Sequence, residues 1–119
     1  MKKGEKVLVV EESPLVATAI EAASDRFPVQ LDRASDGWQA IEMLENEHYD
    51  AIVIDSELPR HSGFGVITYL REEVGEHLDN VIVMTTSDED TLRKKLRADQ
   101  LRVVSRDNAV DALGHVLSE

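Results

Sequence analysis

The chain has 119 residues, a formal net charge of −11 and no cysteine. A chain of this length buries about two-thirds of its unfolded surface in one domain, and the lack of cysteine excludes disulfides, thiolate metal sites and cysteine nucleophiles. The acidic balance argues against direct binding to nucleic acid, and no apolar run reaches the length of a membrane span. We therefore expect a single domain over residues 1–119, in the cytoplasm and without a membrane anchor.

Five apolar runs with strand-like composition occur along the chain, and each is followed by a segment with helical spacing. The predicted strands are Lys6–Val10, Val29–Arg33, Ala51–Ile54, Val81–Met84 and Leu101–Val104. Strands that alternate with helices form parallel βαβ units, with helices on both faces of the sheet. The first, third and fourth runs are apolar throughout, as in strands that are covered on both faces. The predicted fold class is α/β, with a doubly wound five-stranded parallel sheet.

Capping residues and apolar stripes predict the helices. The first helix is expected to have Ser13 as its N-cap and Pro14 as its first residue, and to end at Phe27-Pro28. Its predicted apolar stripe is Leu15, Ala19, Ala22 and Ala23. The second helix follows Ser35-Asp36-Gly37, and its predicted face is Trp38, Ile41 and Leu44. The third follows Ser62-Gly63 and packs through Val66, Ile67 and Leu70, the fourth runs from about Glu89 to Arg97, and the last from about Ala109 to Leu117.

Polar residues follow the predicted strands, at the edge where such sheets bind ligands. Glu11 and Glu12 follow the first strand and Asp55 follows the third, so three carboxylates are expected close together. Like charges repel unless a cation neutralises them, and an all-oxygen set of ligands suits Mg²⁺. The alternative, that these carboxylates simply face water at loop starts, stays open at this point.

Other chemistries fit the sequence less well. The chain has no phosphate-binding G-x-x-x-x-G-K-[ST] loop and no G-x-S-x-G nucleophile elbow, and its four histidines show no metal-ligand spacing. A carboxylate can itself act as a nucleophile toward phosphorus and form an aspartyl phosphate. Asp55 is the candidate for that role.

Three sequence blocks, taken together and in order, resemble the receiver domain of two-component response regulators over nearly the whole chain. The first is the acidic pair Glu11-Glu12, and the second is "AIVIDSELPRHSGF", which matches D-x-x-x-P-x-x-x-G through Asp55, Pro59 and Gly63. The third is Thr85 in "VIVMTTSD", followed by Thr86 where the family usually has a small residue. The resemblance implies a flavodoxin-like (βα)5 fold with strand order 2-1-3-4-5. The 119 residues hold no output domain, so we expect either a stand-alone receiver or a fragment of a longer regulator.

The resemblance also implies a function, that of a signalling domain and not of an enzyme. A receiver accepts a phosphoryl group from a sensor histidine kinase or phosphotransfer protein, here on Asp55, as part of a phosphorelay. The family binds Mg²⁺ (or Mn²⁺) through the acidic pair, the aspartate and the backbone carbonyl two residues on, here Glu57. The Thr85 hydroxyl then moves to the phosphoryl group, and the face of helix four, strand five and helix five changes its protein contacts. We expect a monomer or weak homodimer.

Three departures from the family touch the site or its readout. A Glu-Glu pair stands where Asp-Asp or Glu-Asp is usual, which predicts weakened metal affinity because Mg²⁺ tolerates little deviation from octahedral geometry. The strand-five lysine is replaced by Ser105, or its role is taken by Arg106 one residue on, and Arg102 or Leu101 stands at the usual aromatic switch position. Basic residues gather on the expected target-binding face: Arg93, Lys94, Lys95, Arg97 and Arg102.

Two alternatives to a phosphoaccepting receiver remain. One is a receiver-like interaction module that works without phosphorylation, which the missing lysine and aromatic residue favour. The other is a haloacid-dehalogenase-like phosphatase that uses Asp55, although this chemistry needs a second aspartate where Glu57 stands. The basic run also has a simpler interpretation, that of a solvated helix face.

Overall fold

The computed structural model describes residues 5–23, 29–55, 65–66, 72, 80–85 and 102–118. The elements with defined bounds in these ranges are β1 (Glu5–Val10), α1 (Pro14–Ala23), β2 (Val29–Ala34), α2 (Gly37–Asn46), β3 (Ala51–Asp55), β4 (Val81–Thr85), β5 (Arg102–Ser105), the 3-10 helix η4 (Arg106–Asn108) and α5 (Ala109–Ser118). None of the described helices is long and apolar enough to cross a membrane.

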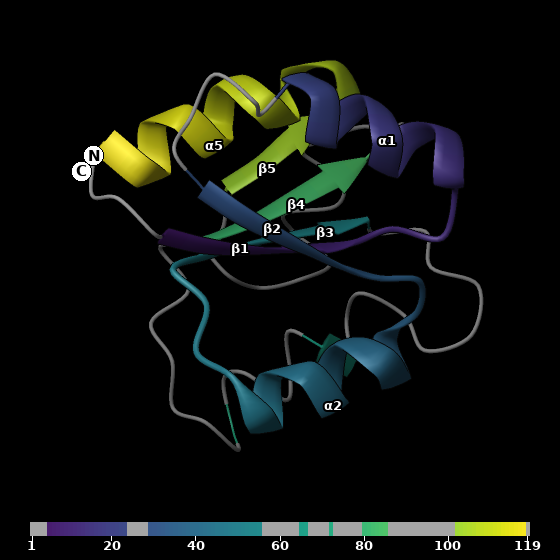
Figure 1. Ribbon diagram of the computed structural model, residues 1–119. Helices are drawn as coiled ribbons and strands as arrows, with labels where there is room; N and C mark the ends of the chain where they lie inside the picture. Colours follow the sequence, from purple (N-terminus) through teal and green to yellow (C-terminus); the bar gives the residue numbers. More distant parts are fainter. Residues whose placement is uncertain are drawn as a thin grey trace.

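The five strands form one parallel sheet in the order β2-β1-β3-β4-β5. Helices α1 and α5 cover one face of the sheet and α2 covers the other (Figure 1). This arrangement confirms the predicted flavodoxin-like α/β fold and its strand order. Because all strands run in the same direction, their carboxyl ends lie along one edge of the sheet, which we call the carboxyl edge. The opposite edge is called the amino edge.

The core consists of two clusters, one on each face of the sheet. Leu8, Val10 and Ile54 face the side of α2, whereas Val7, Val9 and Val53 face α1 and α5. This division follows from the two-residue period of a strand, which points successive side chains to opposite faces. All residues of β3 and β4 are buried, as are the last four of β1, so the central strands are covered on both faces as predicted.

Helix α1 begins as predicted but turns a different face to the sheet. The Ser13 Oγ accepts a hydrogen bond from the Val16 N–H at 3.4 Å, which confirms Ser13 as the N-cap. The predicted apolar stripe is wrong, since Leu15 is 84% exposed and Ala19 and Ala22 are also exposed, while the side chain of Ala23 lies outside the described set. The residues that face the core are Val16, Ala17 and Ile20. Val16 and Ile20 are four residues apart and share the face toward the core, and because a helix turns about 100° per residue, Leu15 lies off that face.

Helix α2 shows a similar difference. The Asp36 side chain caps it by accepting a hydrogen bond from the Gln39 N–H at 2.8 Å. Ile41 and Leu44 pack against the α2-side core as predicted, but Trp38 is 65% exposed and does not share their environment. The buried residues of α2 are Gly37 and Ala40, both in its first turn, and their small size allows the helix to approach the sheet closely.

Several predictions fall partly or wholly on residues outside the described ranges. These are the end of the first helix at Phe27-Pro28, the residues Ile67 and Leu70 of the third helix, the whole fourth helix, and Leu101. Val66 is described and is buried in the α2-side core. Four strands extend one residue beyond the predicted end: β2 to Ala34, β3 to Asp55, β4 to Thr85 and β5 to Ser105.

Candidate functional site

Three polar side chains are buried in the part of the chain that the structure describes, and all three lie at the carboxyl edge. Glu11 directly follows β1, Asp55 is the last residue of β3, and Thr85 is the last residue of β4. They are 1%, 4% and 2% exposed, respectively. Sequence analysis predicted all three as site residues, and the fold brings them to one edge.

The strand register places the two buried carboxylates next to each other. Val9 pairs with Val53 and Val10 with Ile54, so the next step along both strands brings Glu11 beside Asp55. Adjacent strands in a sheet lie about 4.8 Å apart. Asp55 in turn pairs with Met84, the residue before Thr85, which places the hydroxyl one strand further along the same edge.

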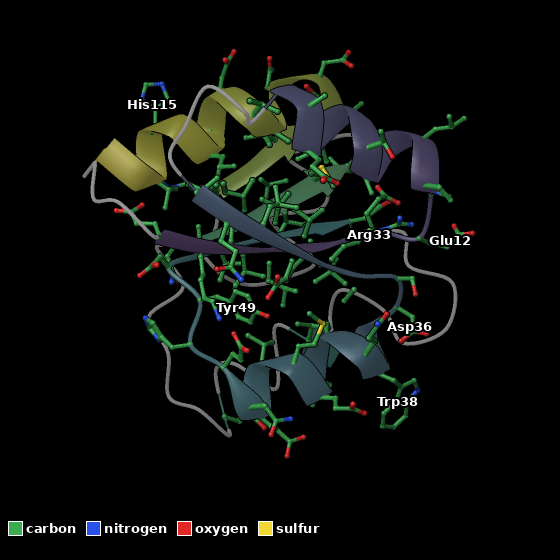
Figure 2. All side chains as sticks on the ribbon, viewed as in Figure 1. Glu12, Arg33, Asp36, Trp38, Tyr49 and His115 are labelled. Atoms are coloured by element: carbon green, nitrogen blue, oxygen red, sulfur yellow. The ribbon has the colours of Figure 1, made fainter. Side chains whose placement is uncertain are left out.

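The two adjacent glutamates lie in different environments. The Glu11 N–H donates to the Ala34 carbonyl at 2.9 Å and so continues the hydrogen bonds between β1 and β2. The Glu11 carboxylate is buried, and its Oε2 accepts a hydrogen bond from the Ser13 N–H at 2.9 Å. Glu12 is exposed and points outward from the carboxyl edge (Figure 2). Sequence analysis had placed both glutamates in the predicted metal site.

The buried carboxylates suit a hard cation. Mg²⁺ is usually bound by one or two carboxylates and keeps several waters, and Glu11 and Asp55 supply two carboxylates on adjacent strands. Within the described ranges, no three Asp, Glu, His or Cys side chains are grouped so that they could hold a metal ion. Glu57, whose backbone carbonyl is a predicted ligand, lies outside these ranges. The described residues therefore fit Mg²⁺ through a pair of carboxylates.

Strand β5 brings Ser105 to the site. Ser105 is the last residue of β5, pairs with Thr85, and is half-buried. Arg106 follows as the first residue of η4, but its side chain is not among those described, and Thr86 lies outside the described ranges. The position at the end of β5, opposite the buried Thr85, is thus occupied by a serine.

The predicted target-binding face is described only at one residue. Arg102 is the first residue of β5, pairs with Ile82 and is half-buried. The other predicted members lie outside the described ranges: Arg93, Lys94, Lys95 and Arg97.

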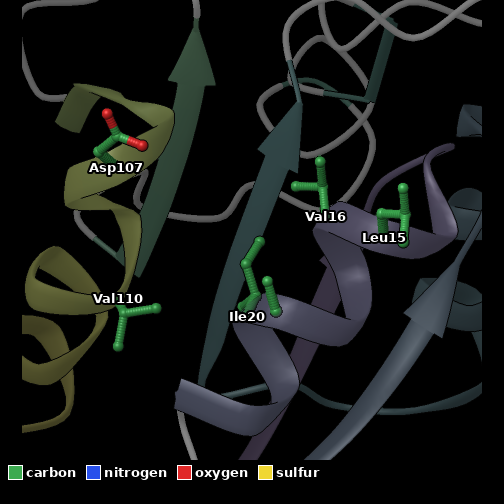
Figure 3. Close-up of a pocket in the computed structure, with 6 residues that line it drawn as sticks. Leu15, Val16, Ile20, Asp107 and Val110 are labelled. Carbon is green, nitrogen blue, oxygen red and sulfur yellow. The ribbon is translucent and has the colours of Figure 1, made fainter.

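An apolar groove between α1 and α5 was not predicted from the sequence. Its volume is about 340 Å³, and its lining is Leu15, Val16, Ala19, Ile20, Asp107 and Val110 (Figure 3). Helix α1 starts directly after the Glu11–Ser13 segment and η4 starts directly after Ser105, so the groove adjoins the carboxyl edge. The available signal was the run Leu15, Val16 and Ala17, because three successive apolar residues span about 200° of a helix and cannot all face the core.

The amino edge holds a network of polar contacts of a different kind. The Lys6 N–H donates to Asp50 Oδ2 at 2.8 Å, the Asp50 N–H donates to the Lys6 carbonyl at 2.8 Å, and the Lys6 ammonium forms an ion pair with Glu47. Tyr49, which lies between α2 and β3, reaches from this edge to Asp32 inside β2, and its hydroxyl donates to Asp32 Oδ2 at 2.7 Å. Burial, together with the Asp32 carboxylate, raises the pKa of Tyr49 to about 12.

Comparison with known sequences identifies relatives of this chain. A family model for the response regulator receiver domain matches residues 7–118. The autoinducer 2 sensor kinase/phosphatase LuxQ of Vibrio vulnificus is 31% identical over 104 residues, which cover 86% of this chain and 12% of LuxQ. The alkaline phosphatase synthesis transcriptional regulatory protein PhoP of Bacillus subtilis is 31% identical over 85 residues, covering 71% of this chain and 35% of PhoP. The chain thus spans only a minor part of either relative.

Solved structures share the fold. The chemotaxis response regulator CheY4 of Vibrio cholerae superposes with a TM-score of 0.81 at 18% identity, over 96% of this chain and 99% of CheY4. The receiver domain of sensor histidine kinase PA1611 from Pseudomonas aeruginosa, with a magnesium ion coordinated in its active site cleft, gives a TM-score of 0.75 at 23% identity. That match covers 98% of this chain and 99% of the PA1611 domain.

Proposed function

Because the chain belongs to the response regulator receiver domain family, we propose that it accepts a phosphoryl group on Asp55 from the phosphohistidine of a sensor histidine kinase or phosphotransfer protein. The observation that carries the proposal is the burial of Glu11, Asp55 and Thr85 at the carboxyl edge. Burying two carboxylates side by side costs free energy, so stability alone does not account for them. A site that binds a cation and a phosphoryl group does.

The proposed chemistry needs few groups. An Asp55 carboxylate oxygen attacks the phosphorus, a P–O bond forms, and the P–N bond to the donor histidine breaks. Glu11, Glu12 and Asp55 would hold Mg²⁺ or Mn²⁺, together with the Glu57 carbonyl. When bound, the cation offsets the negative charge of the carboxylates and the phosphoryl oxygens. The Thr85 hydroxyl donates a hydrogen bond to the phosphoryl group once it is attached.

The proposed partners are proteins. The groove beside α1 supports docking of the phosphodonor there, because it combines apolar lining, the exposed Leu15 and immediate contact with the carboxyl edge. The changed contacts after phosphorylation are proposed at the basic face that includes Arg102. In this role the chain is a cytoplasmic signalling domain, either a monomer or a weak homodimer, and not an enzyme.

Intact-mass measurement after incubation with Mg²⁺ and a small phosphodonor tests the proposal. We expect the wild-type chain to gain one phosphoryl group and Asp55→Asn to gain none. Asp50→Asn is the matched control, because it makes the same chemical change just before the other end of β3. Wild-type protein that stays unmodified would overturn the proposal.

One observation favours a second function, that of an interaction module independent of phosphorylation. Ser105 occupies the end of β5 opposite Thr85, where a receiver usually has a lysine that pairs with the aspartate. Partner binding that persists in Asp55→Asn, without Mg²⁺ or phosphodonor, would support this module. If the wild-type chain is phosphorylated and Ser105→Lys changes the lifetime of the phosphoryl group, the result supports the phosphoaccepting receiver and not the interaction module.

A further inference from the structure

We infer that the outer face of α2 is an interaction surface for a basic segment of a partner protein. This surface, which we call the α2 face, consists of Trp38, Glu42 and Glu45. An arginine of the partner stacks on the Trp38 ring, and the two carboxylates accept hydrogen bonds from the partner's basic side chains. The inference goes beyond the proposed function, because the α2 face shares no residue with the carboxyl edge, the groove or the basic face.

Helical spacing brings the three side chains together. Glu42 follows Trp38 by four residues and Glu45 follows it by seven, and residues at these spacings are neighbours on one face of a helix. All three residues are exposed. The other side of α2 covers the sheet, where Ala40 is buried and Leu44 packs against the core. The α2 face is therefore not used in packing the helix on the sheet.

Trp38 is the only tryptophan of the chain, and it is 65% exposed. Its side chain points away from the sheet in the first turn of α2 (Figure 2). Tryptophan is enriched among the residues that contribute most to protein interfaces. A single exposed apolar residue is nevertheless common on protein surfaces, so exposure alone does not indicate a partner. The charges beside the ring supply the second observation.

The carboxylates of the α2 face are not neutralised within the described part of the chain. Neither Glu42 nor Glu45 forms an ion pair with a described residue, and α2 itself contains no basic residue. In the sequence, no Lys or Arg stands between Arg33 and Arg60. Glutamates on a helix surface are often paired with a basic residue three or four positions away, and these two are not. The α2 face is therefore complementary to a positively charged partner.

A ring beside two carboxylates selects arginine as the partner's contact residue. Tryptophan attracts cations more strongly than the other aromatic side chains do. A guanidinium group can stack on the ring while its N–H groups donate to a neighbouring carboxylate, whereas the ammonium group of lysine is a point charge. The α2 face extends about 10 Å along the helix axis, which is longer than one guanidinium group covers. A segment with more than one basic side chain therefore fits it.

Fluorescence of the full chain tests the inference, because all tryptophan emission comes from the α2 face. The probes are short blocked peptides of alanine that carry several arginines, several lysines or several glutamates. We expect the arginine peptide to change the emission and to bind about threefold or more tightly than the lysine peptide, and the glutamate peptide not to bind. Binding should weaken as the salt concentration rises from about 50 mM to about 300 mM. Equal affinity for the arginine and lysine peptides would overturn the inference.

Substitutions separate the α2 face from the overall negative charge of the chain. With a fluorescein-labelled arginine peptide, anisotropy should show binding about tenfold weaker in Trp38→Ala and about two- to fivefold weaker in Glu42→Gln and Glu45→Gln. Glu21→Gln is the matched control, because it removes the same charge from an exposed position of α1, across the sheet from α2 (Figure 1). It should bind as tightly as wild type, and circular dichroism checks that each variant is folded. Full affinity in Trp38→Ala, or equal losses in Glu21→Gln and Glu42→Gln, would overturn the inference.

A second copy of the chain is the alternative occupant of the α2 face. We expect the chain alone to show the same Trp38 emission at all concentrations, because the occupant is a different protein. Sedimentation of wild type and Trp38→Ala checks this expectation. Self-association that Trp38→Ala abolishes would overturn the inference, since the α2 face would then bind another copy of the chain.

Discussion

The two edges of the sheet contain polar residues of similar types but arrange them differently. At the amino edge, opposite charges meet in the contacts of Lys6 with Asp50 and Glu47, and Tyr49, just before β3, donates a hydrogen bond to Asp32 within β2. At the carboxyl edge, two carboxylates of the same charge, Glu11 and Asp55, are buried on adjacent strands. The amino edge contains interactions that stabilise a fold. The carboxyl edge contains two like charges on adjacent strands, which a bound cation would offset in the proposed function.

The comparison predicts that a divalent cation stabilises the protein through the carboxyl edge alone, and this is the largest expected effect. At about 100 times its dissociation constant, Mg²⁺ should raise the free energy of unfolding by about 2.7 kcal/mol, because it binds the folded state. Urea unfolding with and without Mg²⁺ measures this gain. Asp55→Asn should lose most of it, whereas Tyr49→Phe at the amino edge should keep it. A similar gain in wild type and Asp55→Asn would contradict the assignment of the cation to this edge.

The second prediction concerns the amino edge. Tyr49→Phe removes the hydroxyl that donates to Asp32 and should lower the free energy of unfolding by about 2 kcal/mol, the usual contribution of a hydrogen bond to a charged group. Phosphorylation by a small phosphodonor should be unchanged. Urea unfolding measures the first quantity and intact mass the second. A variant that is as stable as wild type would contradict the contribution of this hydrogen bond. A variant that no longer accepts a phosphoryl group would show that the two edges are not separate in function.

The third prediction follows from the pKa of Tyr49, which is raised from 10.0 to about 12 in the folded state. A raised pKa means that folding favours the protonated hydroxyl, so this stabilisation is fully present below pH 10 and is lost as the pH rises through 12. The stability difference between wild type and Tyr49→Phe should therefore shrink between about pH 10 and pH 12. Unfolding of both proteins across this range measures it, and a constant difference would refute the link to the hydroxyl.

The smallest expected effect is at the ion pair between Lys6 and Glu47, whose side chains are 29% and 44% exposed. Exposed pairs contribute about 0.2–1 kcal/mol, so Glu47→Gln should destabilise the protein by no more than that. The loss should decrease further at high salt, because ions screen exposed charges. Unfolding at low and high ionic strength measures both. A larger loss that does not depend on salt would point to a structural role for Glu47 beyond the ion pair.

The strands and the members of the site could be predicted from the sequence because they depend on short patterns. The apolar run of β3 ends in Asp55, and that of β4 ends in Thr85, so parallel strands alone bring them to one edge. The helix faces were harder to predict. Leu15 and Trp38 have several small or apolar neighbours in the sequence. The spacing of apolar residues therefore did not distinguish which of them would pack on the sheet.

Other features of the site depend on tertiary structure. Glu11 and Glu12 are the same amino acid, so their side chains alone do not distinguish them. The hydrogen bond from the Glu11 N–H to the Ala34 carbonyl continues the pairing of β1 with β2 through residue 11, and Glu11 is buried whereas Glu12 is exposed. The bond between Tyr49 and Asp32 joins residues 17 positions apart and depends on how β2 lies beside β1. The groove is formed by α1, η4 and α5, which meet only in the folded chain.

The most direct test of the carboxyl edge as a phosphorylation site is to locate the phosphoryl group. Borohydride reduces an acyl phosphate to an alcohol and so marks the modified residue permanently, and peptide mass spectrometry then identifies it. After treatment with Mg²⁺ and a small phosphodonor, we predict the mark at Asp55 and at no other carboxylate. A mark on another residue, Glu11 included, or no mark at all, would contradict the account.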